Sequence, residues 1–418
     1  MATLPLPAAI APTQPPGGRP IEPHRIGFTG AGSEYFGVWF VNLLLTIVTL
    51  GLYTPWARRR TAQYFYSHTQ VVGSPLEFVA EARRMALGFL VFAALYVAYE
   101  LALQTGQDLA ASLLFFGFAA LLPLLWGSAM RFRLGATRWR GIRLGFTASW
   151  REVYLASWPV FAIAAIWTLA FVAGAALLPD APADATRDAP PSMPSAEQTL
   201  TVLGLLGAAL VPTLLCLIRL EYNYKRLLVA HARIGGQAGR WKPVFGDFVR
   251  VWLAAAGVFV LTLIAIVFLG IVSTSLWWAV LGPILRGSGV IGMILALYLG
   301  LLGAVLLVVL ASLPARAYRE ARMFRLVWSQ VGFGQLARSR CDLRTGAYVW
   351  LRVKNVLLSF LTLGLYRPFA IASEYAAKVQ SVTLHVKGRA EQLEAELVRQ
   401  QGAFGDAAAD ALGLDLIG

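Results

Sequence analysis

Apolar runs of about twenty residues recur along this chain, and that is the length a helix needs to cross roughly 30 Å of hydrocarbon. Such helices satisfy their own backbone hydrogen bonds, which lipid cannot do for them. Hydrophobic residues make up 58% of the chain and charged residues 14%, against about 45–50% and about 25% in soluble domains. We therefore predict six transmembrane helices, at 85–103, 109–130, 155–178, 199–218, 252–281 and 290–313.

Two further runs, 36–56 and 348–369, are apolar but carry more polar residues. They lie in a duplicated segment, because 35–57 aligns with 348–370 without gaps and eleven of 23 positions are identical. If both runs cross, the protein has eight spans and its C-terminus lies outside. If both re-enter or lie on the surface, it has six spans and two cytoplasmic tails. Each run is long enough to cross, so we favour eight, and the re-entrant alternative stays open.

The two copies carry the same polar side chains at helical spacing, on one face of each helix. If these faces meet, they form a polar path or ligand site; the commoner role of such residues is hydrogen bonding between packed membrane helices, at about 1 kcal/mol or less each. The candidate polar path is Asn42, Thr46, Thr49 and Tyr53 in the first copy and Asn355, Ser359, Thr362 and Tyr366 in the second. Each copy also ends in residues that break or kink a helix. These are Gly51 and Pro55, and Gly364 and Pro368.

The basic residues are confined to alternate loops. The net charge is +14, and 25 of the 36 Lys and Arg residues lie in loops 57–84, 131–154, 219–251 and 314–347. The three connections opposite hold only two. This is the positive-inside pattern, which predicts that the four basic loops are cytoplasmic. Because the cations are dispersed in this way, the charge does not indicate nucleic-acid binding.

A short motif centred on glycine recurs within these loops. Residues 68–78 match 136–146, a degenerate copy lies at 231–236, and 332–334 resembles a fourth. Their alternating character predicts short extended or hairpin pieces at the membrane surface. Cations next to aromatic residues suit contact with anionic lipid headgroups, although insertion topology alone also requires them. The headgroup-contact candidates are Arg58, Arg59, Arg60, Arg138 and Arg140.

The remaining composition indicates no reaction. The chain has two cysteines and four scattered histidines without the spacing of a metal site, and no nucleophile and base lie within a helical turn of each other inside a clear span. We therefore expect no metal, no cofactor and no enzymatic activity. The chain divides into a disordered, proline-rich N-terminal tail (1–34), a membrane domain (35–370) and a C-terminal tail (371–418).

Several motifs resemble those of the YjgN family of bacterial inner-membrane proteins, from about Phe28 to the end of the chain. The resemblance implies a multi-pass protein of the bacterial inner membrane, and it supplies no reaction and no catalytic residue. One loop departs from the pattern, with Ala-Thr-Arg-Trp at 136–139 where an Asn-Thr-Arg-Tyr-like string is expected. The motifs are FTGAGSEYFGVW at 28–39, the block 42–57 with the arginines and the Tyr-Phe-Tyr that follow it, the loop around Gly141 and Phe146, EYNYK at 221–225 and LGLDLI at 412–417.

The sequence thus predicts an all-α polytopic membrane protein, with a duplicated, Gly/Pro-broken segment at each end of six clear spans and small extended pieces in its cytoplasmic loops. The leading functional hypothesis is a transporter or channel for a small polar solute that passes between the two polar stripes. The alternative is a structural or regulatory membrane protein that contacts lipid headgroups or a membrane partner. The expected surroundings are the lipid bilayer and its anionic headgroups.

Overall fold

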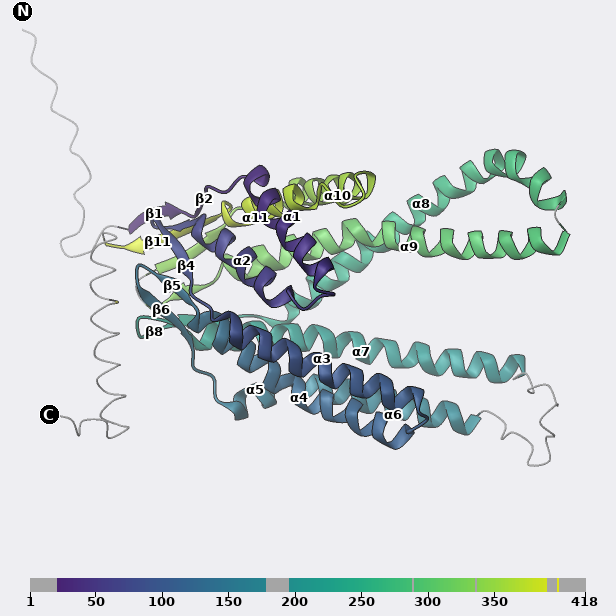
Figure 1. Cartoon of the computed structure of the whole chain (residues 1–418), viewed down its shortest axis with the longest axis horizontal. Coiled ribbons are helices and arrows are strands. Elements are labelled where there is room, and N and C mark those ends of the chain that lie inside the picture. The colour runs from purple at the N-terminus through teal and green to yellow at the C-terminus, as the bar shows by residue number, and fades with distance from the viewer. Residues whose placement is uncertain (1–20, 178–194, 288, 335–336, 389–396, 398–418) are drawn as a thin grey trace, which may run out of the picture.

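Long helices extend from one end of the molecule, where a β-sheet joins them (Figure 1). The computed structural model describes residues 21–177, 195–287, 289–334, 337–388 and 397. Most of the predicted N-terminal tail and most residues after 388 lie outside this part. The boundary predicted at residue 370 falls inside helix α11 (Arg367–Val379), and the division into domains stays a prediction.

Six helices of the described chain are long and apolar enough to span a membrane, which confirms the six predicted spans. Between 0 and 17% of the apolar part of each helix is buried inside the protein, so these helices present their side chains to lipid. A capping box starts the short helix α5 at Ser149 and the long helix α7 at Ser195. The helices are α3 (Ala82–Gln104), α4 (Asp108–Gly135), α6 (Trp158–Leu177), α7 (Ala196–His231), α8 (Phe245–Gly287) and α9 (Gly289–Trp328), with α5 (Trp150–Ala156) leading into α6.

The two broken segments form helical hairpins with the same local structure. In the first, α1 (Gly32–Val48) ends before Gly51, whose φ is +90°, and α2 (Thr54–Ser67) runs back. In the second, α10 (Thr345–Leu361) ends before Gly364, whose φ is +92°, and α11 follows. The left-handed conformation of these glycines reverses the chain. A proline in the first turn then starts each returning helix, where its missing N–H costs nothing.

Both ends of each helical hairpin connect to the sheet. Helix α1 follows strand β2 (Gly27–Phe28) and α2 precedes β3 (Thr69–Val71), while α10 follows β10 (Ala337–Cys341) and α11 precedes β11 (Val382–Lys387). Each segment therefore returns to the end of the molecule at which it started, as the re-entrant alternative requires. The favoured count of eight crossings is not confirmed. Run length misleads here because a left-handed turn within the last quarter of each apolar run ends the first helix and starts a second one.

Eleven short strands form one antiparallel sheet that closes on itself. The amide of Ile26 donates to Val382 O, and the amide of Thr29, three residues later, donates to His68 O. In an extended chain these amides point to opposite edges, so the N-terminal strand pair bridges the two ends of the sheet. We call this closed sheet the β ring. Its strands are β1 (Ile21–Arg25), β2 (Gly27–Phe28), β3 (Thr69–Val71), β4 (Ser74–Phe78), β5 (Thr137–Trp139), β6 (Ile142–Phe146), β7 (Ala232–Ile234), β8 (Gln237–Arg240), β9 (Gly332–Phe333), β10 (Ala337–Cys341) and β11 (Val382–Lys387).

Eight strands of the β ring, β3 to β10, form hairpins in the four basic loops, at or next to the positions predicted for extended pieces, whereas β1, β2 and β11 lie outside these loops. Three hairpins turn through two residues with positive φ, at 72–73, 140–141 and 235–236, which is the type I′ geometry that suits the twist of antiparallel strands. All four basic loops therefore lie at the same end of the molecule. The label all-α is too narrow, because a closed sheet of very short strands joins the helices.

Candidate functional site

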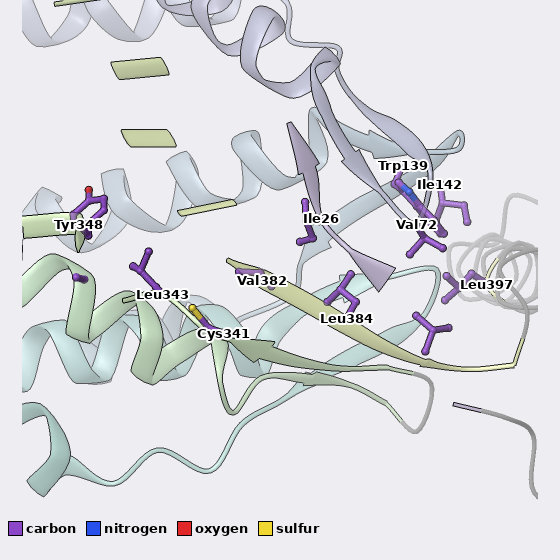
Figure 2. Packing of buried hydrophobic residues seen from close by; sticks show 12 residues of the cluster. Ile26, Val72, Trp139, Ile142, Cys341, Leu343, Tyr348, Val382, Leu384 and Leu397 are labelled. Atoms are coloured by element: carbon purple, nitrogen blue, oxygen red, sulfur yellow. The ribbon is translucent and has the colours of Figure 1, made fainter. Parts of the chain in front are cut away.

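The β ring and the adjoining helix ends line a half-open pocket of about 820 Å³, which we call the chamber. This volume lies in the range of small-molecule sites, which is about 300–1,000 Å³. Apolar side chains from the strands and from helices α4, α7 and α9 form most of its wall. Figure 2 shows several of them, including Leu384 of β11 and, farther round the ring, Trp139 close to Val72. Leu397, which is 2% exposed, packs into the same cluster.

Charged side chains line the chamber where helices α7, α9, α10 and α11 meet it. We call six of them the charged belt: Glu221, Lys225, Arg319, Glu320, Arg352 and Lys378. On α7, the Glu221 carboxylate lies 2.7 Å from Lys225 Nζ and accepts a hydrogen bond from Trp252 Nε1 at 2.8 Å. Arg319 of α9 reaches the same carboxylate at 3.3 Å, and its guanidinium lies over the Trp252 ring, 4.4 Å from the ring centroid.

The second half of the belt is built around Glu320, the residue after Arg319 on α9. Its carboxylate lies 2.8 Å from Lys378 Nζ and also pairs with Arg352. The Tyr348 hydroxyl donates to it at 2.9 Å. Arg352 also pairs with Glu374 at 3.2 Å. Four helices therefore meet through two carboxylates, each of which is shared by two cations.

The environment of this cluster fixes the charge states of two residues on α10. Burial, reinforced by the nearby Glu320 carboxylate, raises the pKa of the Tyr348 hydroxyl, so it remains a neutral hydrogen-bond donor. Burial opposes the charge of Arg352. The Tyr348 hydroxyl and the two carboxylates beside Arg352 outweigh that burial and raise its pKa, so the guanidinium remains charged.

The charged belt lies just beyond the apolar stretches of its two spanning helices. The apolar part of α7 ends at Ile218, and Glu221 follows within one turn; the apolar part of α9 ends at Leu313, and Arg319 follows within two turns. With these stretches in the bilayer, the belt lies at the level of the lipid headgroups. The chamber therefore combines an apolar interior with a charged boundary at the membrane surface.

The residues of the predicted polar path bond within their own helical hairpins. Asn42 donates to Ala57 O at 3.3 Å, and Asn355 donates to Ala370 O at 3.3 Å. The Thr46, Thr49 and Thr362 hydroxyls donate to backbone carbonyls one turn earlier in the chain. The structure thus places each stripe against its own returning helix, and none of the eight residues lines the chamber. The solute path stays a prediction.

The headgroup-contact candidates are divided between two elements. Arg58, Arg59 and Arg60 lie on α2, with Arg60 donating to the Tyr53 hydroxyl at 3.4 Å. Arg138 and Arg140 lie in and beside β5. Arg140 occupies a turn position with φ of +49° and donates to Ser74 Oγ at 2.7 Å, so it ties two neighbouring β hairpins together.

Sequence reasoning missed the charged belt. Its members are far apart in the chain, as Arg319 and Glu221 show with a separation of 98 positions. One signal was present, because Glu221 and Lys225 are spaced as a helical ion pair next to an apolar span. In the described residues, His, Cys, Asp and Glu side chains do not gather in groups of three that could hold a metal ion.

Comparison with known proteins supplies a family and no activity. Residues 23–411 match the family described as bacterial protein of unknown function (DUF898). The chain is 26% identical over 151 residues to the inner membrane protein YjgN of Salmonella typhimurium, which covers 36% of this chain and 38% of that protein. It is 30% identical over 131 residues to YjgN of Escherichia coli O157:H7, covering 31% of this chain and 33% of the relative. These matches span about a third of the relatives' length. No solved structure matches.

Proposed function

Because the chain belongs to the DUF898 family of bacterial proteins, whose relatives are inner membrane proteins, we propose that it is a binding protein that takes up an amphipathic molecule from the bilayer. The chamber carries this proposal. Its apolar wall suits a hydrocarbon tail, and its charged belt lies at the depth of a headgroup. Binding, rather than catalysis, is the role that this arrangement supports.

The orientation in the membrane follows the charge pattern. We place the β ring and its four basic loops in the cytoplasm, because Lys and Arg are retained on that side. The spans then number six, the duplicated hairpins α1–α2 and α10–α11 re-enter from the cytoplasmic face, and anionic headgroups surround Arg58, Arg59 and Arg60. Fusions of a reporter to residue 388 test this orientation, and a periplasmic signal would contradict it.

Narrowing the chamber is expected to weaken the binding of an amphiphile at least tenfold. Val327 of α9 lines the chamber, so Val327→Trp puts an indole into the space of the ligand tail. Val309→Trp is the matched control, because Val309 lies on the same helix and is 50% exposed on the lipid side. The measurement is saturable binding of tritiated myristyl alcohol, myristate and myristyl phosphate to the purified protein in nanodiscs of zwitterionic lipid. If none of the three binds saturably, or if Val327→Trp binds as tightly as Val309→Trp, the proposal fails.

Transport of a small polar solute is a second candidate, and one observation favours it. The side-chain oxygens Oδ1 of Asn42 and Asn355 are buried and have no hydrogen-bond partner among the described residues. Such an oxygen normally costs stability, so its presence at equivalent positions of both hairpins is consistent with a site for a hydrogen-bond donor.

Replacing both asparagines with leucine separates the two roles of the stripes. Asn355→Leu is expected to destabilise the protein more than Asn42→Leu, because the Asn355 amide also lies within hydrogen-bonding distance of Ser373 Oγ and Glu374 Oε1. Each lost buried bond costs about 1–3 kcal/mol. Folding is followed by thermal unfolding and transport by solute uptake into proteoliposomes. If the double variant folds and its solute uptake is unchanged, the two asparagines have only a structural role.

A further inference from the structure

We infer that the chamber selects a single-chain amphiphile with an anionic headgroup, a carboxylate or a phosphate, and that the cations of the charged belt hold this headgroup. The inference rests on the proposed binding function and narrows its ligand to one chemical class. The size of the chamber, its excess of positive charge and the arrangement of its arginines each contribute a separate argument.

The volume of the chamber suits a ligand with one tail. Sites of roughly 300–1,000 Å³ hold one drug-sized molecule, and the chamber, at about 820 Å³, lies in the upper part of that range. One acyl chain with a small headgroup is a molecule of that size.

The lining charge is unbalanced in favour of an anion. Six cationic side chains line the chamber against two carboxylates, Glu221 and Glu320. Each carboxylate already accepts from two cations of the belt, so neither has a free face for a cationic headgroup. Partly buried charges without a full complement of opposite charge are costly. An anionic headgroup supplies that missing charge, whereas a neutral or cationic one does not. The six cations are Lys225, Arg233, Arg316, Arg319, Arg352 and Lys378.

Two arginines on α9 have donors to spare. A guanidinium carries five N–H donors in a planar fork that matches carboxylate and phosphate oxygens. Arg319 donates to one Glu221 oxygen and stacks on Trp252, which holds its plane in a fixed orientation. Arg316 lies one turn earlier and borders the chamber with an exposed side chain, and among the described residues it takes part in no ion pair. A headgroup near these side chains can form several charge-assisted hydrogen bonds, which are about twice as strong as neutral ones.

The headgroup panel tests this inference on the intact protein in zwitterionic nanodiscs. Myristate or myristyl phosphate is expected to bind at least tenfold more tightly than myristyl alcohol, and the preference is expected to shrink at high salt because screening weakens charge interactions. The stronger of the two anions identifies the headgroup. Since all three probes share one tail, the comparison isolates the charge.

Variants then assign the preference to the belt and to Arg316 beside it. Arg316→Gln removes a chamber cation without breaking an ion pair, and glutamine at all six belt residues removes four cations together with both carboxylates. We expect Arg316→Gln to weaken anion binding severalfold and the combination of all seven substitutions to reduce the anion preference at least tenfold, with alcohol binding unchanged. Arg325→Gln is the matched control, because Arg325 is exposed on the same helix and lies outside the chamber. Gel filtration and thermal unfolding verify that each variant is folded.

The outcomes separate this inference from the proposed function. Equal affinity for the alcohol and both anions overturns the headgroup assignment and leaves the binding function intact. An anion preference that persists in the folded variant with all seven substitutions, or that is as large in Arg316→Gln as in Arg325→Gln, also overturns it, because these cations are then not its source. Failure of all three amphiphiles to bind removes the binding function and the headgroup assignment together. If Arg316→Gln lowers the anion preference and Arg325→Gln does not, the result supports both the binding function and the headgroup assignment.

Discussion

Replacing Gly239 with alanine is expected to displace the β7–β8 hairpin from helix α7. The free energy of unfolding is expected to fall by about 1–3 kcal/mol or more, the cost typical of overpacked sites. A Cβ at this position would overlap the carbonyl oxygen of Val229. The backbone fixes the position of a Cβ, and the Val229 carbonyl is itself part of the backbone, so a rotamer change cannot relieve the overlap. Because Val229 lines the chamber, moving the hairpin away also opens the chamber wall.

Gly145→Ala is the matched control for this substitution. Gly145 lies in strand β6 of the same ring, and a Cβ there would meet no other atom within 4 Å. Both variants reduce the freedom of the unfolded chain to the same degree, so their difference reports the overlap alone. Thermal unfolding of both variants in the same detergent measures this difference in stability. Equal melting temperatures for the two variants would contradict the close approach of β8 to α7.

Trp139→Ala is expected to cost about 3–5 kcal/mol, the usual effect of truncating a large buried aromatic residue. Trp139 is 3% exposed, and its indole Nε1 donates to Val71 O at 2.9 Å. The side chain therefore joins two neighbouring β hairpins through both packing and a hydrogen bond. The loss is expected to lower the melting temperature and the affinity for the amphiphile together, since Trp139 lines the chamber.

Two further variants divide this effect into its causes. Trp139→Phe keeps most of the packing and removes the hydrogen bond, so about 1 kcal/mol is expected. Trp350→Ala removes an indole that is 71% exposed on α10, so a change within about 0.5 kcal/mol is expected. Thermal unfolding of the three variants, measured in parallel, provides the comparison. If Trp139→Ala unfolds at the same temperature as Trp350→Ala, the stability of the β ring does not depend on the contacts of Trp139.

The helical part of the fold could be predicted because a membrane span needs a long apolar run and little else. The spans at 85–103 and 109–130 correspond to α3 and α4 within a few residues at most boundaries. The runs 36–56 and 348–369 could not be assigned by length, because the deciding feature is a left-handed glycine near the C-terminal end of each. That conformation depends on local hydrogen bonds, such as Gly51 N to Thr46 O at 2.7 Å.

The β ring and the charged belt could not be predicted from the sequence alone. Strands of two to six residues give a weak periodic signal, and their stability comes from neighbours contributed by other loops. The sequence could predict that the loops contain short extended pieces. It could not predict that these pieces pair into one closed sheet. The belt likewise depends on which helix ends the β ring brings together. Glu221 gives a local signal through Lys225, but its partners Trp252 and Arg319 are defined only by the fold.

The closure of the β ring also determines when the protein can finish folding. Arg25 of β1 bonds to the Gln380 carbonyl oxygen, 355 positions later in the chain. Contacts between such distant residues form late. During synthesis β1 and β3 therefore emerge long before β11, and the growing sheet has open edges, which other chains can pair with. If the ribosome pauses before residue 382, the partly synthesised chain is expected to keep unpaired strand edges. It is then expected to aggregate or to bind a chaperone until β11 has been synthesised.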